Sequence, residues 1–296
     1  MVNMIILAVV FVIGAFIFQV TLSGFSRKVV ARIQKRRGPT VFQNFYDIGK
    51  LLFKESSISH GFIFDFGIWM ALGSTIATLL FMPVGGWALM PKYANIIVII
   101  YLLAVGSLGM AMSAVGSGNP LASIGVSRAL TQMFAYELPF VVIAVLIIYL
   151  AKSSNILKII EYQTQNGWNL FSMPIGALVA YISLMGMLGK KPFDTPIAPA
   201  EIASGPLVEY SGKYLGFLMI QHEFATFIEV GLFVHLFMGS TSIIGFLIKY
   251  IIVYISAVMI SSVMARLKID EVVKFYWRWP LGLAILQAII TLGVRF

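Results

Sequence analysis

YANIIVIIYLLAVGSLGMAMSAV, residues 93–115, decides the fold class, because it contains no charged side chain. A helix crosses the hydrocarbon core of a membrane with about 20 apolar residues, so this run predicts a transmembrane helix. Similar runs recur along the chain, which is 59% apolar and 11% charged, whereas soluble domains carry about 25% charged residues. The sequence therefore predicts an integral membrane protein solvated mainly by lipid.

Eight such runs predict a polytopic all-α bundle of about eight transmembrane helices in a single domain, residues 1–296. The first run is too long for a signal-peptide core and is followed by basic residues, so we expect it to remain as a helix. The predicted spans are 4–24, 66–90, 93–115, 127–150, 173–188, 215–237, 242–264 and 279–294, with loops 25–65, 116–126, 189–214 and 265–278 on one side.

The distribution of Lys and Arg predicts the orientation. Sixteen of the 21 cations lie in or at the edge of the four loops on one side, whereas Lys92, Lys152, Lys158 and Arg295 lie on the other. Because cations in short loops remain in the cytoplasm, both termini should face away from it across the cell membrane. The net charge of +9 then reflects topology and contact with anionic lipid, and nucleic-acid binding is not expected.

The first loop contains two segments that do more than connect. Residues 41–55 alternate apolar and polar side chains as an amphipathic helix, which could anchor in the interface or shape a cavity entrance. The preceding stretch RKVVARIQKRRGP, residues 27–39, is more basic than orientation requires. It could contact lipid phosphates or dock a soluble partner, and the candidate docking residues are Arg27, Lys28, Arg32, Lys35, Arg36 and Arg37.

The third of these loops, KKPFDTPIAPAEIASGPLVEYSGKY at residues 190–214, is predicted to be rigid. Its four prolines restrict the backbone, and its glycines permit tight turns. Three carboxylates, Asp194, Glu201 and Glu209, punctuate it near the cytoplasmic surface. They are either ordinary charges of a solvated loop or carboxylates that a rigid loop holds in place for a function.

Several ionisable residues lie within the predicted spans, where a charge costs about 2.5–3.5 kcal/mol at the helix centre and suggests a function. On an α-helix, His222 and Glu229 project within about 20° of each other, whereas Glu223 lies about 100° from His222. The span at 215–237 should therefore have polar partners on two sides. The candidates for a proton or ion path are Glu137, His222, Glu223, Glu229 and Lys249, with His235 nearby on the same span.

Two explanations of this group remain open. A carboxylate could pair with Lys249 or Arg128 and serve only to hold helices together. One lysine cannot neutralise three carboxylates, however, and unpaired buried carboxylates become able to exchange protons. The absence of cysteine from all 296 residues excludes disulfides and cysteine-held iron–sulfur clusters, so any redox centre should sit on another chain.

Five motifs, in order, resemble the H-type subunit (subunit 1) of respiratory complex I and its relatives in membrane-bound nickel–iron hydrogenases and sulfane sulfur reductase. The resemblance covers nearly the whole chain. The motifs are RKVVARIQKRRGP at 27–39, YDIGKLLFKE at 46–55, SRALTQMFAYE at 127–137, the PFD, AEI and GPLVEYSG elements at 192–212 with the Glu223 region, and RLKIDEVVKFYW at 266–277.

This resemblance implies a subunit that binds no cofactor or metal and lies beneath iron–sulfur and large redox subunits, one of which could carry a nickel–iron site. Antiporter-like membrane subunits would be its other partners, and the buried glutamates would carry protons or sodium. Asp194, Glu201 and Glu209 would couple the redox subunits to the membrane. In quinone-reducing relatives the loop commonly has acids where this chain has Ile197 and Pro199. That departure counts against a quinone site and a full acidic relay. GPLVEYSG resembles the hydrogenase branch instead, which favours an energy-converting hydrogenase or a related ferredoxin-driven sulfur-reducing complex over a subunit lining a quinone site.

Two rivals come from other classes. A self-sufficient secondary transporter also has buried charges, but it usually shows internal repeats with paired broken helices, and no repeat is evident here. A membrane-embedded enzyme would need a metal or nucleophile motif such as HExxH, which the sequence lacks.

Overall fold

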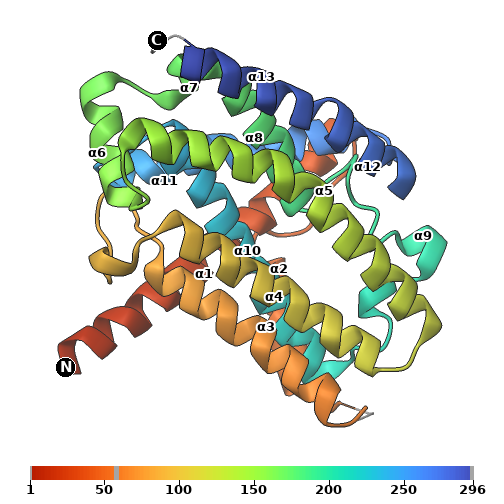
Figure 1. Ribbon diagram of the computed structural model, residues 1–296. Coiled ribbons are helices and arrows are strands. Elements are labelled where there is room, and N and C mark those ends of the chain that lie inside the picture. Colours follow the sequence, from red (N-terminus) through yellow and green to blue (C-terminus); the bar gives the residue numbers. More distant parts are fainter. Residues whose placement is uncertain (1, 57–59, 294–296) are drawn as a thin grey trace.

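The computed structural model describes residues 2–56 and 60–293, and they form a bundle of helices (Figure 1). Val294 and Arg295, the predicted end of the last span and an outer cation, lie outside the described residues. Within the described part, six helices are long and apolar enough to cross a membrane, and α8 and α13 are shorter apolar helices. These eight are α1 (Val2–Ile33), α3 (Phe62–Phe81), α4 (Ile96–Gly116), α5 (Pro120–Ala151), α8 (Pro174–Met187), α10 (Gly212–Phe237), α11 (Ile243–Val263) and α13 (Pro280–Gly293).

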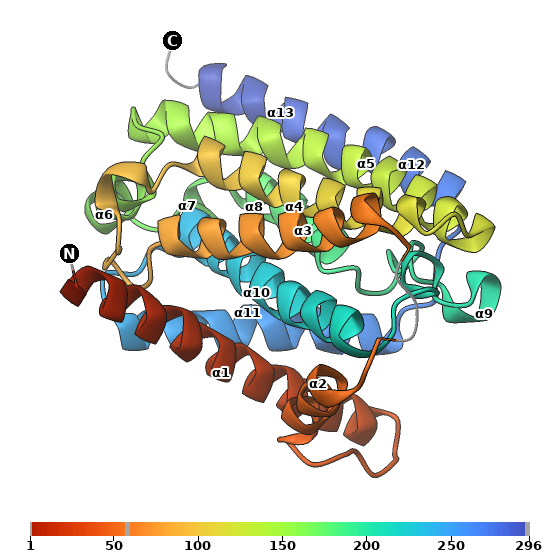
Figure 2. The same cartoon turned by 90° about the horizontal axis from the view of Figure 1, so that it is seen from below.

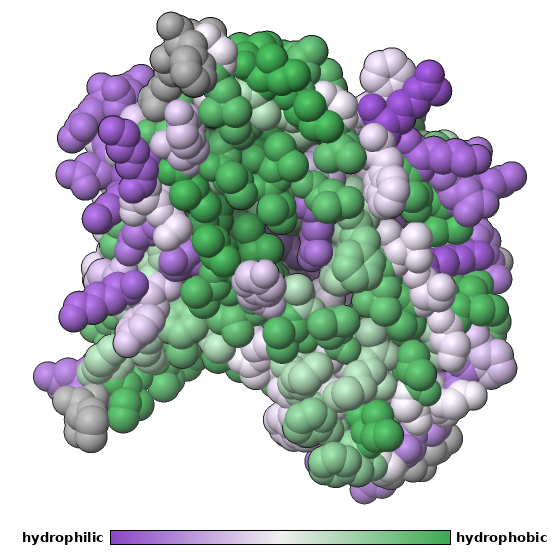
Figure 3. All heavy atoms as spheres, viewed as in Figure 1, coloured by the Kyte–Doolittle hydropathy of each residue, from purple (hydrophilic) through white to green (hydrophobic). Residues whose placement is uncertain are grey.

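The predicted all-α membrane bundle is confirmed, and short elements lie at its two ends. One end, here called the basic end, carries α2 (Gln43–Phe53), α9 (Pro199–Ile202), η2 (Gly205–Leu207) and α12 (Ile269–Arg278). The opposite end carries η1 (Pro91–Tyr93), α6 (Ile156–Asn166) and α7 (Asn169–Ser172), and α1 begins there (Figure 2). Between the two ends an apolar band covers the face seen in Figure 3, as expected for a surface that meets lipid.

Several helix ends differ from the sequence prediction. Helix α1 continues to Ile33 instead of ending at residue 24, so the basic segment begins as helix. Helix α5 begins at Pro120, at the first helical position where a missing N–H costs nothing, after an Asn119 side chain that accepts from the N–H of Leu121 at 2.8 Å. The loop predicted at residues 116–126 is therefore mostly helical.

The second span shows the largest difference, because α3 ends at Phe81 instead of residue 90. Met82 precedes a proline and is extended, which is the conformation that the proline ring favours. Gly85 and Gly86 follow with φ of +56° and +80°, and a Cβ on Gly85 would lie 2.5 Å from the backbone of Ile243. This turn packs against the start of α11 at the opposite end.

Close packing of small residues joins α3 to α4. A Cβ built on Gly67 would lie 2.6 Å from the Cβ of Ser113, and one on Gly109 would lie 2.7 Å from the backbone N of Ala71. Membrane helices use such small residues to bring their backbones together.

Helix α10 runs through the interior of the bundle, as its polar residues predicted. All its residues from Thr226 to Phe237 are buried except Glu229, which is half-buried. The second half of helix α10 is therefore surrounded by protein, and the helix carries its ionisable groups past several other helices.

Candidate functional site

Two membrane-embedded carboxylates face one internal cavity. Glu137 on α5 and Glu229 on α10 both line a cavity of about 40 Å³, together with Tyr136 and Gln221. Pro139 follows Glu137 closely and has no N–H to offer to the carbonyl group one turn earlier, which makes α5 locally irregular. The amide of Gln221 makes one wall of the cavity polar. Its Nε2 donates to Oγ1 of Thr75 at 3.3 Å, which holds the side chain in place.

A second cavity lies between this carboxylate pair and the basic end. It has a volume of about 300 Å³ and is lined by His222, Lys190 and Asp194 among others. It shares Tyr136 with the smaller cavity, along with Ser107 and Met187. The two cavities therefore adjoin, and ionisable groups line them from the loop after α8 to Glu229 in the middle of the bundle.

His222 and Glu229 do not share one cavity, although the helical wheel placed them on one seam. His222 lines the larger cavity nearer the basic end, where it has accessible surface, and Glu229 lines the smaller one. Tyr136, like Ser107 and Met187, lines both cavities and so lies between them.

Glu137 also reaches the outside of the bundle. It lines an apolar groove of about 380 Å³ between α4 and α5, bordered by Ile100 and Val141. Glu137 is thus shared between the internal cavity and this groove.

Glu223 belongs to a separate polar cluster on the other side of α10, as its angular position predicted. Its carboxyl group lies near Ser23 and Gln19 on α1. The hydroxyl of Tyr250 on α11 donates to Oε1 of Gln19 at 2.7 Å. The cluster therefore joins α1, α10 and α11, apart from the Glu137–Glu229 cavity.

Lys249 and His235 lie at the opposite end of the bundle. The ammonium group of Lys249 donates to the carbonyl oxygens of Met238 and Gly239 and lies 4.4 Å from the ring centroid of Trp168. The imidazole Nε2 of His235 is 2.9 Å from the carbonyl oxygen of Pro83. Lys249 therefore caps the end of α10, and the structure does not bring it to the carboxylates with which the sequence grouped it.

Two of the three loop carboxylates meet at one arginine. Both carboxylate oxygens of Asp194 accept from Arg266, at 2.8 and 2.7 Å. Glu201 accepts from Nη1 of Arg128 at 2.8 Å and lies 3.6 Å from Arg266. Glu209 is held apart from them, where its carboxylate accepts from the Asn119 amide at 2.5 Å. The loop is thus fastened to α5 and to the segment between α11 and α12.

These ion pairs shift the pKa of the groups they join. The hydrogen bond from Arg128 lowers the pKa of the Glu201 carboxyl below its usual 4.5, and Arg266 acts in the same direction. The hydrogen bond to Asp194 raises the pKa of the Arg266 guanidinium, which stays charged at any working pH.

Gln132 anchors the loop after α8, a role that was not predicted from the sequence. It is buried on α5, and its Nε2 donates to the carbonyl oxygen of Phe193 at 2.7 Å. Its Oε1 accepts from the hydroxyl of Thr195 at 2.5 Å. An amide within the predicted span at 127–150 was the available signal, because such a group needs partners inside a membrane.

The six candidate docking residues lie at the end of α1 and in the turn that follows. Arg27, Lys28 and Arg32 are on α1, and Lys35, Arg36 and Arg37 come after it. Nη1 of Arg27 donates to the side chains of Asn44 and Asp47 on α2, the latter at 3.2 Å. The amphipathic helix predicted at residues 41–55 corresponds to α2, which this contact fixes against α1.

The ionisable side chains that line these cavities are proton-binding and ion-pairing groups, and the described residues do not form a metal site. Among residues 2–56 and 60–293, no three His, Asp or Glu side chains come together as a metal site would require. The groups that converge can bind, hold or relay protons and cations.

Comparisons with known proteins point to one family. The sequence model of the family described as NADH dehydrogenase matches residues 4–292. The chain is 29% identical to the H-type subunit of NADH-quinone oxidoreductase from Geobacillus thermodenitrificans, with 97% of this chain and 95% of that protein covered. It is 30% identical to hydrogenase-4 component C of Escherichia coli, with 82% of each chain covered.

Among solved structures, a chain of the membrane-bound sulfane sulfur reductase, an archaeal respiratory membrane complex, is similar along its whole length. The TM-score is 0.93 at 36% sequence identity, covering 98% of this chain and 99% of that one.

Proposed function

Because the chain belongs to the NADH dehydrogenase family, we propose that it couples a peripheral redox arm to ion translocation through its buried glutamates. Its relatives show that it is a membrane subunit of the kind found in complex I-like, hydrogenase-type and sulfur-reductase complexes. The finer assignment, a cofactor-free coupling subunit, rests on the geometry of its ionisable groups.

The observation that carries the proposal is the row of adjoining cavities. One end of the row is lined by Lys190 and Asp194 at the basic end, and the other by Glu137 and Glu229 within the membrane. Few helical membrane proteins hold two carboxylates in one small cavity without a functional reason, because each is costly to bury. A charge that moves at the Asp194 end would alter the protonation of the carboxylates, since charges interact strongly in a low dielectric.

The loop after α8 would transmit movement of the redox partner to the cavity. It is clasped by Arg266 through Asp194 and by Arg128 through Glu201, and it also forms one wall of the larger cavity. A redox event in a subunit bound against this loop would shift the ion pair between Asp194 and Arg266, here called the clasp. The charges that line the cavity would move with it. Protons or sodium ions would then pass by way of Glu137, which also faces the groove between α4 and α5.

Glu223, which lies in a second polar cluster, would take part by a separate branch along α1. Lys249 would hold the end of α10 in place instead of carrying ions.

The proposed roles of the two ends indicate which partners would bind to each. Iron–sulfur and large redox subunits would cover the basic end, which would face the cytoplasm by the positive-inside rule. Antiporter-like membrane subunits would continue the ion route beside Glu137. The similarity to the sulfane sulfur reductase chain and the missing acids at Ile197 and Pro199 favour a hydrogenase or sulfur-reducing complex over a quinone-reducing one.

The test uses the intact complex reconstituted in liposomes, with ions translocated per electron as the measurement. The Glu137→Gln substitution keeps the size of the side chain and removes its charge. We expect electron transfer to continue while the ion yield falls at least fivefold. Glu161→Gln, which removes an exposed carboxylate on α6 at the opposite end, should leave the yield unchanged.

An unchanged yield in a normally assembled Glu137→Gln complex would refute the route. Transport by the purified chain alone would instead support a self-sufficient transporter. The identity of the large subunit that co-purifies, with or without nickel-ligating cysteines, would separate the hydrogenase from the sulfur and quinone reductases.

A further inference from the structure

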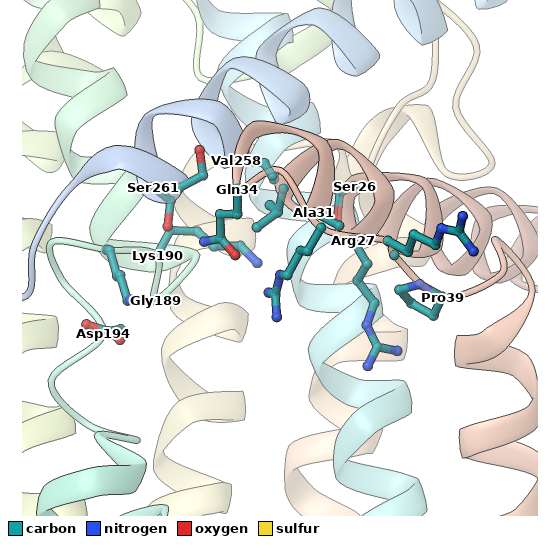
Figure 4. A pocket seen from close by; sticks show the side chains of 16 residues that line it. Ser26, Arg27, Ala31, Gln34, Pro39, Gly189, Lys190, Asp194, Val258 and Ser261 are labelled. Carbon is teal, nitrogen blue, oxygen red and sulfur yellow. The ribbon is translucent and has the colours of Figure 1, made fainter.

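A large cavity opens at the basic end, outside the Glu137–Glu229 cavity (Figure 4). Its volume is about 560 Å³, and its walls are the end of α1, the turn after it, the loop at residues 189–194 and the end of α11. Figure 4 shows Arg27 of α1 and Lys190 of the loop among the side chains that line it. The proposed ion route leaves most of these side chains without a role.

The cavity carries a large excess of positive charge. Five cations line it, and Asp194, the one carboxylate among the lining residues described, already has both oxygens bonded to Arg266. Only Arg27 has an ion pair of its own, with Asp47 at 3.2 Å; among the described residues no ion pair involves the other four. The cations are Arg27, Arg36, Arg37, Lys190 and Lys191.

The depth of the cavity matches the headgroup layer of a membrane. Helix α1 has 32 residues. At 1.5 Å per residue it is about 48 Å long, longer than a hydrocarbon core of about 30 Å. Arg27 lies in its last two turns, so the cations should sit where lipid phosphates are.

Apolar surface lies directly beside the charged cavity. Its floor includes Val30 and Val258, and the last turns of α11 place Met259 and Val263, exposed to 48% and 78%, next to the lining residue Ser262. A ligand with a phosphate and hydrocarbon chains would satisfy both features, whereas a fully polar anion would satisfy only the first.

We propose that this cavity binds the phosphate group of an anionic membrane phospholipid. Arginine forks and lysine ammonium groups bind phosphate oxygens, and anionic lipids are drawn to clusters of four or more cations at the membrane surface. The headgroup lies between Arg37 and Lys190, and the acyl chains run along the end of α11. Free phosphate shares the chemistry of the headgroup but lacks the chains. This inference stands whether or not the ion route is correct.

The test is a lipid titration of the purified, delipidated complex in detergent, read by native mass spectrometry. Phosphatidylglycerol is the anionic probe, phosphatidylcholine is the neutral one, and inorganic phosphate is the competitor. The variant Arg37→Gln with Lys190→Gln removes two cations from the cavity. Its matched control, Lys92→Gln with Lys158→Gln, removes two exposed cations from the opposite end.

We expect the apparent Kd for phosphatidylglycerol to rise at least tenfold in the cavity variant and to change less than twofold in the control. The charge-preserving variant Arg37→Lys with Lys190→Arg should retain binding, which separates loss of charge from loss of folding. Equal binding by the neutral lipid, or by all variants, would overturn the proposal. So would binding of inorganic phosphate without binding of phosphatidylglycerol, which would mark a free-phosphate site. Loss of a partner subunit with lipid binding intact would also overturn it and would mark a protein-docking surface.

Discussion

The clasp between Asp194 and Arg266 offers a quantitative prediction for Asp194→Asn. The asparagine keeps the shape of the side chain but replaces one acceptor oxygen with an NH₂ group, so one of the two charge-assisted hydrogen bonds, at 2.8 and 2.7 Å, is lost with the charge. The two side chains are 17% and 21% exposed, so the pair lies between a surface and a buried one. Such a bond contributes about 1.5–3 kcal/mol, and we expect a loss of about 2 kcal/mol.

This loss should appear as freer opening of the loop after α8. A change of about 2 kcal/mol corresponds to about thirtyfold in the opening equilibrium, since 1.4 kcal/mol is tenfold. Hydrogen–deuterium exchange of the assembled complex should therefore speed up about thirtyfold at the amides of Ala198 and Leu267, whose N–H groups donate to the carbonyls of Asp194 and Pro192.

Two comparisons make this prediction refutable. Asp270→Asn removes a carboxylate from the first turn of α12 and should leave exchange in the loop unchanged. The double variant Asp194→Asn with Arg266→Gln should exchange no faster than Arg266→Gln alone, because both remove one interaction. Unchanged exchange in Asp194→Asn, or additive effects in the double variant, would show that the clasp does not hold the loop.

Three further predictions concern the same framework. The ion pairs of Glu201 lower its folded-state pKa, so they stabilise the fold above the unfolded-state pKa of about 4.5, and this stability is lost as the pH falls through the folded-state pKa. The melting temperatures of the wild type and Glu201→Gln should therefore differ at neutral pH and converge on acidification below pH 4.5. Gly67→Ala should destabilise the α3–α4 contact by about 1–3 kcal/mol, whereas Gly73→Ala on the same helix, where a Cβ meets nothing within 4 Å, should not lower the melting temperature. Gln132→Leu should cost about 3 kcal/mol in thermal unfolding by leaving the Thr195 hydroxyl and the Phe193 carbonyl group buried without this partner, and an unchanged melting temperature would contradict the anchoring role.

The apolar runs predicted the helices of the bundle because the membrane imposes length and composition on each span separately. Their ends were harder to predict. Helix α1 extends to Ile33 because a helix can continue beyond the lipid with basic side chains in the headgroup layer. Helix α3 ends at Phe81 although apolar residues follow, because Pro83 and two glycines with positive φ form a turn there.

Two amphipathic helices, α6 and α12, lie within segments that were predicted only as connections between spans. In α6, Ile156, Ile159, Ile160 and Gln163 are buried at helical spacing, and in α12 Val272 and Tyr276 are buried one turn apart. Both carry too many polar residues to read as spans, although their periodicity was visible. The connection between α11 and α12 also supplies Arg266, whose importance lies in a contact with Asp194, 72 residues away, that no local pattern encodes.

The sequence predicted which ionisable residues belong to the candidate site, but only partly which of them lie together. Glu137 and Glu229 were singled out because a membrane span seldom tolerates them, and the structure places both on one cavity. The helical wheel placed Glu223 correctly apart from His222, since that angle depends on one helix alone. Lys249 was grouped with the carboxylates only because it lies within a predicted span. Its contact with the end of α10 depends on how α10 and α11 are joined.

The central claim is that Glu137 and Glu229 change protonation when the redox partner turns over. Infrared difference spectroscopy of the intact complex, reduced against oxidised, detects the C=O stretch of a protonated carboxyl group directly. We predict carboxyl bands in the wild type, one of which is lost in Glu229→Gln and another in Glu137→Gln, whereas both are retained in Glu161→Gln. Identical carboxyl bands in the wild type, Glu137→Gln and Glu229→Gln would contradict the account.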